Sequence, residues 1–418
     1  MNKYLVFRKR IIASGIGILL AASLAACGST GGSTNVSTET STSVTTEAVT
    51  EKKEEVKATD MSADTTNSAD TNELTSNLTL SDEKDITITE EGTYYITGSV
   101  KNCTIRIEAD KENAKVNIVL DGVSIVNTNK PCIYVVSAAK TTITTKTASS
   151  LKVTGTIEAD GDTTPDAVIY AKDDIKFDGE ACLTLDSSET ESLNTITGKD
   201  DIKFEGGEYK ITSSENAVRA NNSIEVEDGS FTIDAKDDGL HAEYNDDDSV
   251  GNIEITGGTF NIEAGDDGLH ATTTVVISGG DITIDAAEGI EATQVEINDG
   301  NITINASDDG INAAHKSNAI SPLITFNGGN TTITMGAGDT DAVDANGDIV
   351  VNDGVITITA PTSSFDHDGS GTINGGTVTI NGEVVTEMPE DQMGGGRQMG
   401  GQGQMGAPGQ MGDPGQRP

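Results

Sequence analysis

The stretch DDGLHATTTVVISGGDITIDA at residues 266–286 decides the fold of this chain. Its apolar residues alternate with polar ones in three short runs, and the pair Gly279-Gly280 separates the last two runs. Alternation with a period of two predicts β-strands, and no stretch between residues 78 and 386 sustains a helical period. We therefore expect a fold that is nearly all β.

The turn that opens this stretch returns along the chain. Its copies are DDGLHA at 237–242 and 266–271, AEGIEA at 287–292 and DDGINA at 308–313, with looser copies NAVRA at 216–220 and DAVDA at 341–345. The glycines of the four close copies lie 29, 21 and 21 residues apart. A repeat of this size indicates a solenoid. Three short strands in a minimal coil of about 21–22 residues are typical of a parallel β-helix, which we expect to be right-handed because such crossovers almost always are. An antiparallel sandwich is the alternative.

Stacked coils place equivalent inward residues over one another. The longer copies, of 27 to 32 residues, carry loops such as 243–248 and 316–318. One expected inward ladder consists of Phe177, Phe204, Val226, Ile255, Ile277, Ile297, Phe326, Val351 and Ile373.

The ends of the chain differ from the repeats. Residues 1–27 have a basic start, an apolar run and small residues before Cys27, which predicts a lipoprotein signal peptide with lipid attached to Cys27. A transmembrane span is the alternative, but the run is short for one. Residues 28–77 are rich in Ser, Thr and Glu and predict a disordered tether, whereas residues 387–418 predict a disordered Gly, Gln and Met tail. Residues 78–386 are the β-helix domain, anchored at the extracellular face of the cell membrane.

Composition narrows the partners. The formal net charge of −42 argues against nucleic acid and anionic lipid, and it favours divalent cations or basic surfaces. We expect a monomer, because a solenoid grows by adding coils to one chain. Cys103, Cys132 and Cys182 are an odd set without metal-ligand spacing. Either Cys103 and Cys132 form a disulfide or all three are buried thiols, and the thiols are favoured.

The acidic turns are the first candidate site. Equivalent residues of adjacent coils lie about 4.8 Å apart, where two like charges repel by about 1 kcal/mol in water and by roughly 3–4 kcal/mol at an effective dielectric constant near 20. A Ca²⁺ ion, which takes six to eight oxygen ligands, would neutralise such a column. The alternative is that Asp-Gly is simply favourable turn chemistry. The predicted ligands are Asp237, Asp238, Asp266, Asp267, Glu288, Asp308, Asp309 and Asp341, and a weaker acidic stack places Asp173 and Asp174 over Asp200 and Asp201.

An outward ladder beside the acids is the second candidate site. It consists of Arg219, His241, His270, Glu291, Asn312 and Asp344, each two positions after a turn glycine or its equivalent. Bound calcium, Arg219 and the two histidines together suit a ligand that bears carboxylates. A plain solvated face is the alternative.

Several phrases in order resemble the clostridial-type cell-surface carbohydrate-binding lipoproteins. They are GTYYITG at 92–98, VNIVLDGVSI at 116–125, DAVIYAKDDI at 166–175 and the DDG coils, so the resemblance covers about residues 78–386. It implies a right-handed parallel β-helix similar to polysaccharide lyases of the pectate lyase kind. It also implies calcium on acidic turns and binding of plant cell-wall glucans or acidic sugars such as polygalacturonate.

These observations favour a non-catalytic protein that binds plant cell-wall polysaccharide, either an acidic polymer or cellulose. The chain has no Trp and only 3% aromatic residues, which favours the acidic polymer, because aromatic rows are the usual platform for neutral sugar rings. A calcium-dependent lyase is the runner-up, with Arg219 as the base. A structural surface rod stiffened by calcium is the third alternative.

Overall fold

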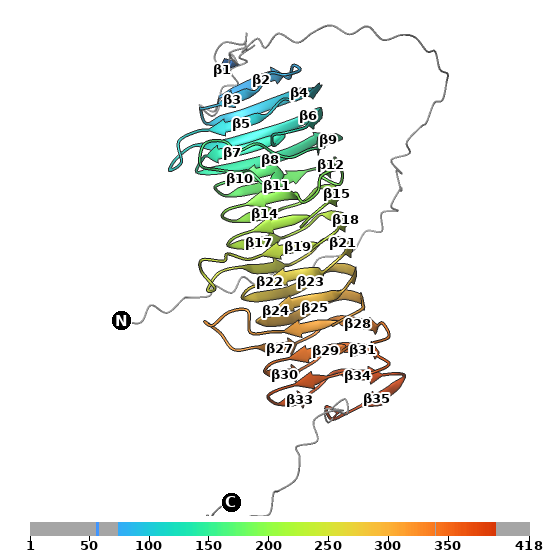
Figure 1. Ribbon diagram of the computed structural model, residues 1–418. Helices are drawn as coiled ribbons and strands as arrows, with labels where there is room; N and C mark the ends of the chain where they lie inside the picture. Colours follow the sequence, from blue (N-terminus) through green and yellow to red (C-terminus); the bar gives the residue numbers. More distant parts are fainter. Residues whose placement is uncertain (1–55, 58–73, 339, 390–418) are drawn as a thin grey trace, which may run out of the picture. The chain divides into compact units, whose positions relative to one another are not determined.

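The computed structural model describes residues 56–57, 74–338 and 340–389, so the expected signal peptide, Cys27 and nearly all of the expected tail lie outside the described residues. Within this part, the chain winds into coils that stack one on the next, from β2 at the N-terminal end to β35 at the C-terminal end (Figure 1). The described residues contain strands, turns and bends and no helix, and accordingly no helix that could cross a membrane. The expected all-β parallel solenoid is confirmed.

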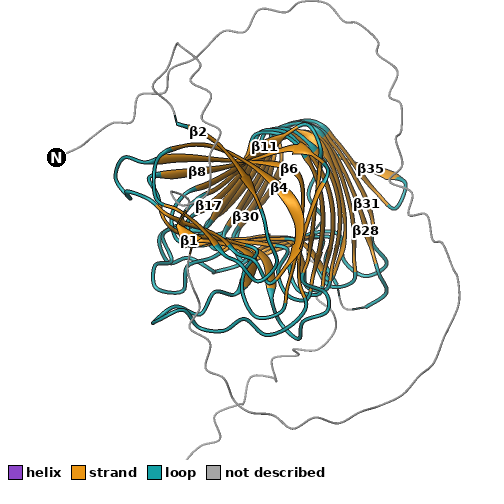
Figure 2. Cartoon of the chain, turned by 90° about the horizontal axis from the view of Figure 1, so that it is seen from above, coloured by secondary structure: helices purple, strands orange, loops and turns teal. Residues whose placement is uncertain are grey.

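Each coil contributes to three faces, which are visible end-on in Figure 2. Face 1 is a sheet of 13 strands. Its strands are β1 (Val56–Lys57), β3 (Ile86–Ile88), β5 (Ile105–Glu108), β7 (Ile133–Ser137), β10 (Ala167–Ala171), β13 (Asn194–Gly198), β16 (Val218–Ala220), β19 (Leu240–Ala242), β22 (Asp267–Ala271), β24 (Glu288–Ala292), β26 (Ile311–Ala313), β29 (Val343–Ala345) and β32 (Asp366–His367).

Faces 2 and 3 belong to one larger sheet, because four long strands run through the bend between them. The long strands are β4 (Gly92–Lys101), β6 (Lys115–Asn127), β23 (Thr274–Ala286) and β25 (Gln294–Ala306). Face 2 also has β2 (Thr75–Thr79), β8 (Lys140–Thr147), β11 (Ile175–Gly179), β14 (Ile202–Phe204), β17 (Ser223–Val226), β20 (Asn252–Ile255), β27 (Leu323–Phe326), β30 (Asp348–Val351) and β33 (Gly371–Ile373). Face 3 also has β9 (Ser149–Val153), β12 (Cys182–Asp186), β15 (Glu208–Ser213), β18 (Ser230–Ala235), β21 (Thr259–Ala264), β28 (Asn330–Met335), β31 (Val355–Thr359), β34 (Thr377–Ile380) and β35 (Glu383–Val385).

The parallel register confirms the expected inward ladder along its whole length. Phe177 pairs with Phe204 on face 2, and the pairing continues coil by coil to Val351 and Ile373. Inside the coils, Phe177 stacks on Phe204 with ring centroids 4.9 Å apart, and Phe231 stacks on Phe260 at 4.6 Å. These rings fill the space between faces 2 and 3 and bury large apolar areas.

The glycine of each DDG phrase is required by close packing rather than by its backbone angle. A Cβ at Gly268 would lie 2.4 Å from the Ile284 side chain and 2.6 Å from the Gly289 carbonyl oxygen. Gly268 and Gly289 also lie inside strands β22 and β24. Turn chemistry alone therefore does not explain the phrase, because its glycine lets face 1 approach the core.

The structure corrects the predicted boundary of the tether. Strand β2 begins at Thr75 and pairs with β4, whereas the β-helix was expected to begin at residue 78. Val56–Lys57 also pair with β3. The physical reason is that β4 offers a hydrogen-bonding edge to β2, which in turn buries Leu78. The alternation in residues 75–79 covers only five residues, which is too few to distinguish this strand from the Ser- and Thr-rich segment before it.

The three described cysteines are free thiols, and all three are buried. This agrees with the favoured alternative. Burial raises the pKa of the Cys103 thiol to about 12, and it raises that of Cys132 as well. Neither thiol is reactive at neutral pH, because the thiolate is the nucleophile.

We predict that Phe204→Ala destabilises the solenoid by about 3–5 kcal/mol, because it removes a ring packed against Phe177, Tyr209 and Phe231. The measurement is the urea midpoint followed by circular dichroism. Val355→Ala, at an exposed residue of β31, is the control and should shift the midpoint little. Equal shifts for the two variants would contradict the prediction.

Candidate functional site

One row of outward side chains runs along the whole of face 1, and we call it the face 1 ladder. The register joins Thr87, Arg106, Tyr134, Tyr170, Thr197, Arg219, His241, His270, Glu291, Asn312, Asp344 and Asp366. The expected part, from Arg219 to Asp344, is present in the expected order. The ladder continues upstream into aromatic and basic residues, so it is basic at one end and acidic at the other.

The acids of the DDG phrases have a backbone role between coils. The Asp267 amide donates to Asp238 Oδ1 at 2.8 Å, and the Asp341 amide donates to Asp309 Oδ1 at 3.1 Å. One coil earlier, the Asp238 amide donates to Asn216 Oδ1 at 3.0 Å. These side chains thus cap amides of the next coil, which repetition of the phrase did not reveal.

The two histidines pair with acids of their own coils. His241 Nδ1 lies 2.6 Å from Asp238 Oδ2, and His270 Nδ1 lies 2.6 Å from Asp267 Oδ2. The two rings stack with centroids 4.6 Å apart. Burial opposes the charged form of His241, but hydrogen bonds to Asp238 and Glu243 outweigh burial and raise its pKa to about 9. Burial and the neighbouring His241 lower the pKa of His270. A charged imidazole therefore stacks on a neutral one.

A loop supplies one more cation. Lys316 Nζ lies 2.5 Å from Glu291 Oε2, and it reaches the ladder from the loop expected at 316–318. Acidic charge still exceeds basic charge here. Burial and neighbouring acids raise the pKa of Asp267 well above its usual range, that of Glu288 to about 8 and that of Asp309 to about 6. These shifts mean that the site favours protons or another cation.

The structure brings some of the predicted metal ligands together. Carboxylate oxygens of Asp237, Asp238 and Asp266 all lie within 4.8 Å of one another. This all-oxygen set fits Ca²⁺, whose ligands lie 2.3–2.6 Å from the ion. A second all-oxygen set, Asp174, Asp200 and Asp201, comes from the weaker acidic stack, and Asp173 instead pairs with Lys111.

Two further groups mix nitrogen and oxygen. They are Asp238, His241 and His270, and Asp267, His270 and Glu291. Imidazole ligands suit transition metals better than calcium, so these groups do not fit the expected ion. Among the described residues, Glu288, Asp308, Asp309 and Asp341 enter no group of three ligand atoms this close.

The upstream part of the ladder forms a small apolar cluster outside the core. Tyr134 and Tyr170 are buried and meet edge to face, with ring centroids 5.5 Å apart. Arg106 and Lys172 lie over the Tyr134 ring, and Lys199 lies over the Tyr170 ring. The rings are therefore packing residues under cations, and they offer no open face for a sugar ring.

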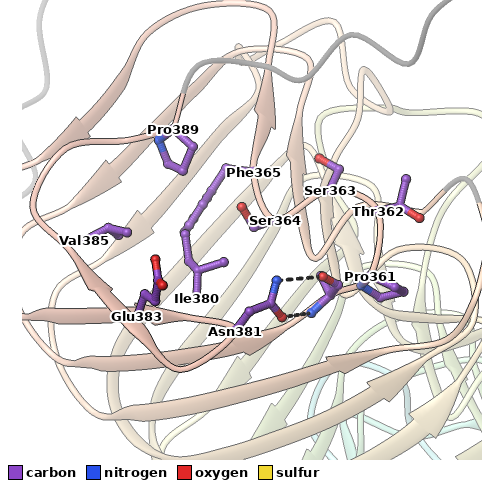
Figure 3. Close-up of a pocket in the computed structure, with 11 residues that line it drawn as sticks. Pro361, Thr362, Ser363, Ser364, Phe365, Ile380, Asn381, Glu383, Val385 and Pro389 are labelled. Carbon is purple, nitrogen blue, oxygen red and sulfur yellow. Dashed lines mark hydrogen bonds between the residues drawn. The ribbon is translucent and has the colours of Figure 1, made fainter.

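Two hollows lie elsewhere. One of about 450 Å³ is at the C-terminal end of the stack, where Phe365, Ile380 and Val385 are among its lining residues and Glu383 is the charged one (Figure 3). Asn381 closes one side by hydrogen bonds with the Ala360 backbone. The other, of about 420 Å³, is lined by Asp234, Glu263 and Asp285 among others. Neither hollow includes a residue of the face 1 ladder.

Comparisons with known proteins found one family model, one relative and one solved structure that resemble this chain. A family model described as carbohydrate-binding domain-containing protein matches residues 82–339 and 288–392. The chain is 30% identical, over 142 residues, to a carbohydrate-binding domain-containing protein of Acetivibrio thermocellus, and the match spans 33% of this chain and 46% of that relative. It is also similar to the solved structure of a polysaccharide lyase-like protein from C. thermocellum, a gadolinium derivative. The TM-score is 0.46 and the identity 29%, over 53% of this chain and 87% of the other.

We predict a pH effect at the acidic end of the ladder. Burial and the nearby Asp309 and Asp341 raise the pKa of Asp344 to about 7. Because the folded protein holds this proton more tightly than the unfolded chain does, the stabilisation is complete below about pH 4 and is lost as the pH rises through 7. In chelator, Asp344→Asn should flatten the fall of the urea midpoint between pH 4 and 8. Asp246→Asn, in an exposed loop, is the control. An unchanged pH profile in Asp344→Asn would refute the assignment.

Proposed function

Because this chain belongs to the family of carbohydrate-binding domain-containing proteins, we propose that it is a non-catalytic binder that holds an acidic polysaccharide along the face 1 ladder. Family membership supports binding of a carbohydrate, and the acidic, polymeric character of the ligand is our inference from the ladder. Polygalacturonate-like polymers suit it better than cellulose.

The observation that carries this proposal is the polarity of the ladder. Arg219 and the charged His241 are adjacent in register, and the Asp237, Asp238 and Asp266 set lies on the turns beside them. A polymer of sugar carboxylates can pair directly with Arg219 and bind through a metal ion at the acids. A neutral glucan gains neither interaction. The absence of an open aromatic face on Tyr134 and Tyr170 points the same way.

Calcium is part of the proposal. Asp237, Asp238 and Asp266 would hold the ion, and it would supply positive charge where the ladder turns acidic. Asp267, Glu288, Asp308, Asp309 and Asp341 extend the acidic surface along the stack. His241 and His270 keep their hydrogen bonds to Asp238 and Asp267, so they orient these carboxylates beside the ion.

The protein is proposed to act at the extracellular face of the cell membrane, attached through lipid on Cys27. A binding domain attached to the membrane in this way would keep polysaccharide close to the cell. The anchor rests on residues 1–27 alone, and labelling with a radioactive fatty acid, lost in Cys27→Ala, would test it.

A polysaccharide lyase is the second candidate. Arg219, which lies on the ladder beside the acids, would serve as the base. Its nearest acid is Asp166, with Nη1 and Oδ2 3.9 Å apart. Lyase action would release unsaturated product, which absorbs near 235 nm, and binding alone would not.

We predict that Arg219→Ala weakens binding of polygalacturonate about 10- to 100-fold, because a charge-assisted hydrogen bond contributes about 1.5–3 kcal/mol. Isothermal titration in calcium measures it, with Lys210→Ala on face 3 as the control and a neutral glucan as the comparison ligand. If absorbance at 235 nm rises with the native protein and not with Arg219→Ala, the protein is a lyase and the proposal of a non-catalytic binder is wrong. Absence of heat with either polymer would leave a structural rod.

We also predict that calcium raises the melting temperature by several degrees, because an ion that binds only the folded state stabilises it. Asp238→Asn and Asp266→Asn should reduce this shift, whereas Asp353→Asn, at an exposed turn, should leave it intact. Differential scanning calorimetry with calcium and with chelator measures it. No shift in the native protein would overturn the calcium site and leave glycan binding to be judged by the titration.

A further inference from the structure

Four buried side-chain atoms without a hydrogen-bond partner gather at one place on face 1. Among the residues that the structure describes, they are Asp166 Oδ1, Asn194 Oδ1, Thr197 Oγ1 and Arg219 Nε. Thr197 is 0% exposed and Asn194 5%. Buried polar groups in folded proteins are almost always satisfied, so such a concentration points to a polar ligand.

The register and the backbone bring these atoms together. Thr197 lies between Tyr170 and Arg219 in the face 1 ladder. Asn194 pairs with Ala167, and its amide donates to the Asp166 carbonyl at 3.1 Å. Asp166, just before β10, and strands β13 and β16 thus supply the four groups from three successive coils.

Two cations complete the group, and their contacts with its acid are loose. Lys199 Nζ lies 3.7 Å and Arg219 Nη1 lies 3.9 Å from Asp166 Oδ2. Both distances exceed that of a hydrogen bond. The three side chains are between 23% and 36% exposed, so a ligand can reach them from solvent. Tyr170 lies beneath Lys199, which covers its ring.

The donors and acceptors define the ligand class. Asp166 and Asn194 Oδ1 only accept, Lys199 and Arg219 only donate, and Thr197 does both. A carboxylate on the ligand would be repelled by Asp166, and a cation would be repelled by Lys199 and Arg219. A hydroxyl group donates to an acid and accepts from a cation at the same time. Neighbouring hydroxyls on a sugar ring therefore satisfy this set.

We propose that Asp166, Lys199 and Arg219, positioned over the buried Thr197, form a subsite for two neighbouring hydroxyls of one sugar ring. The inference rests on the proposed function and deepens it, because it assigns the hydroxyls of the polymer to these residues. Arg219 joins the two regions, since the next residue of the ladder is His241, beside the acids. The carboxylate of an adjoining sugar lies toward His241 and the proposed calcium.

The test is titration of the full chain, in calcium, with polygalacturonate and with polygalacturonate whose ring hydroxyls are acetylated. Asp166→Asn should weaken binding of the plain polymer about tenfold, and Thr197→Val, which removes only the hydroxyl, should weaken it severalfold. The native protein should bind the acetylated polymer about tenfold more weakly than the plain polymer. Acetylation should weaken binding to Asp166→Asn little further, because the substitution and the acetylation remove the same contact.

Asp299→Asn, at an exposed residue of β25 whose carboxylate accepts from the Gly300 amide, is the matched control, and melting curves check that each variant folds. If the native protein binds but Asp166→Asn and Thr197→Val bind as tightly as Asp299→Asn, the subsite is wrong and the proposed function stands. If the native protein binds neither polymer, both are wrong. If acetylation weakens Asp166→Asn as much as the native protein, the hydroxyls bind elsewhere and the subsite is again overturned.

Discussion

The structure depends on the hydrogen bonds between parallel strands of successive coils. They place each residue over its equivalent in the next coil, about 4.8 Å away. Because of this constraint, identical side chains of successive coils contact one another. Phenylalanine rings stack inside the coils, and Asn298, Asn327, Asn352 and Asn374 form a chain of amide hydrogen bonds at an outer turn.

The same constraint stacks like charges, and the ladder shows how the protein handles them. Hydrogen bonds to Asp238 and Glu243 raise the pKa of His241, burial and His241 lower that of His270, and Lys316 from a loop pairs with Glu291. Glu288 and Asp344 have raised pKa values because burial and neighbouring acids both disfavour the charge. Excess negative charge next to Arg219 is the basis of the proposal that a cation and an anionic polymer bind this surface together.

Face 1 thus has three functional zones in register. Tyr134 and Tyr170 pack under basic side chains, Asp166 to Arg219 present unsatisfied hydrogen-bonding groups, and the DDG acids follow. A polymer lying along the coils meets these zones in order. Membership of a carbohydrate-binding family and a surface of this length both suit a polysaccharide.

The sequence by itself determined the solenoid, the inward ladder from Phe177 to Ile373 and the outward ladder from Arg219 to Asp344. The reason is that alternation specifies whether a side chain points inward or outward, and the repeat specifies which residue of the next coil it pairs with. Only the tertiary structure decided that the histidines pair with Asp238 and Asp267, because side-chain direction does not follow from spacing. It also decided the upstream half of the site, where Asp166 and Lys199 lie outside the repeated phrase and meet Arg219 only when three coils of unequal length are stacked.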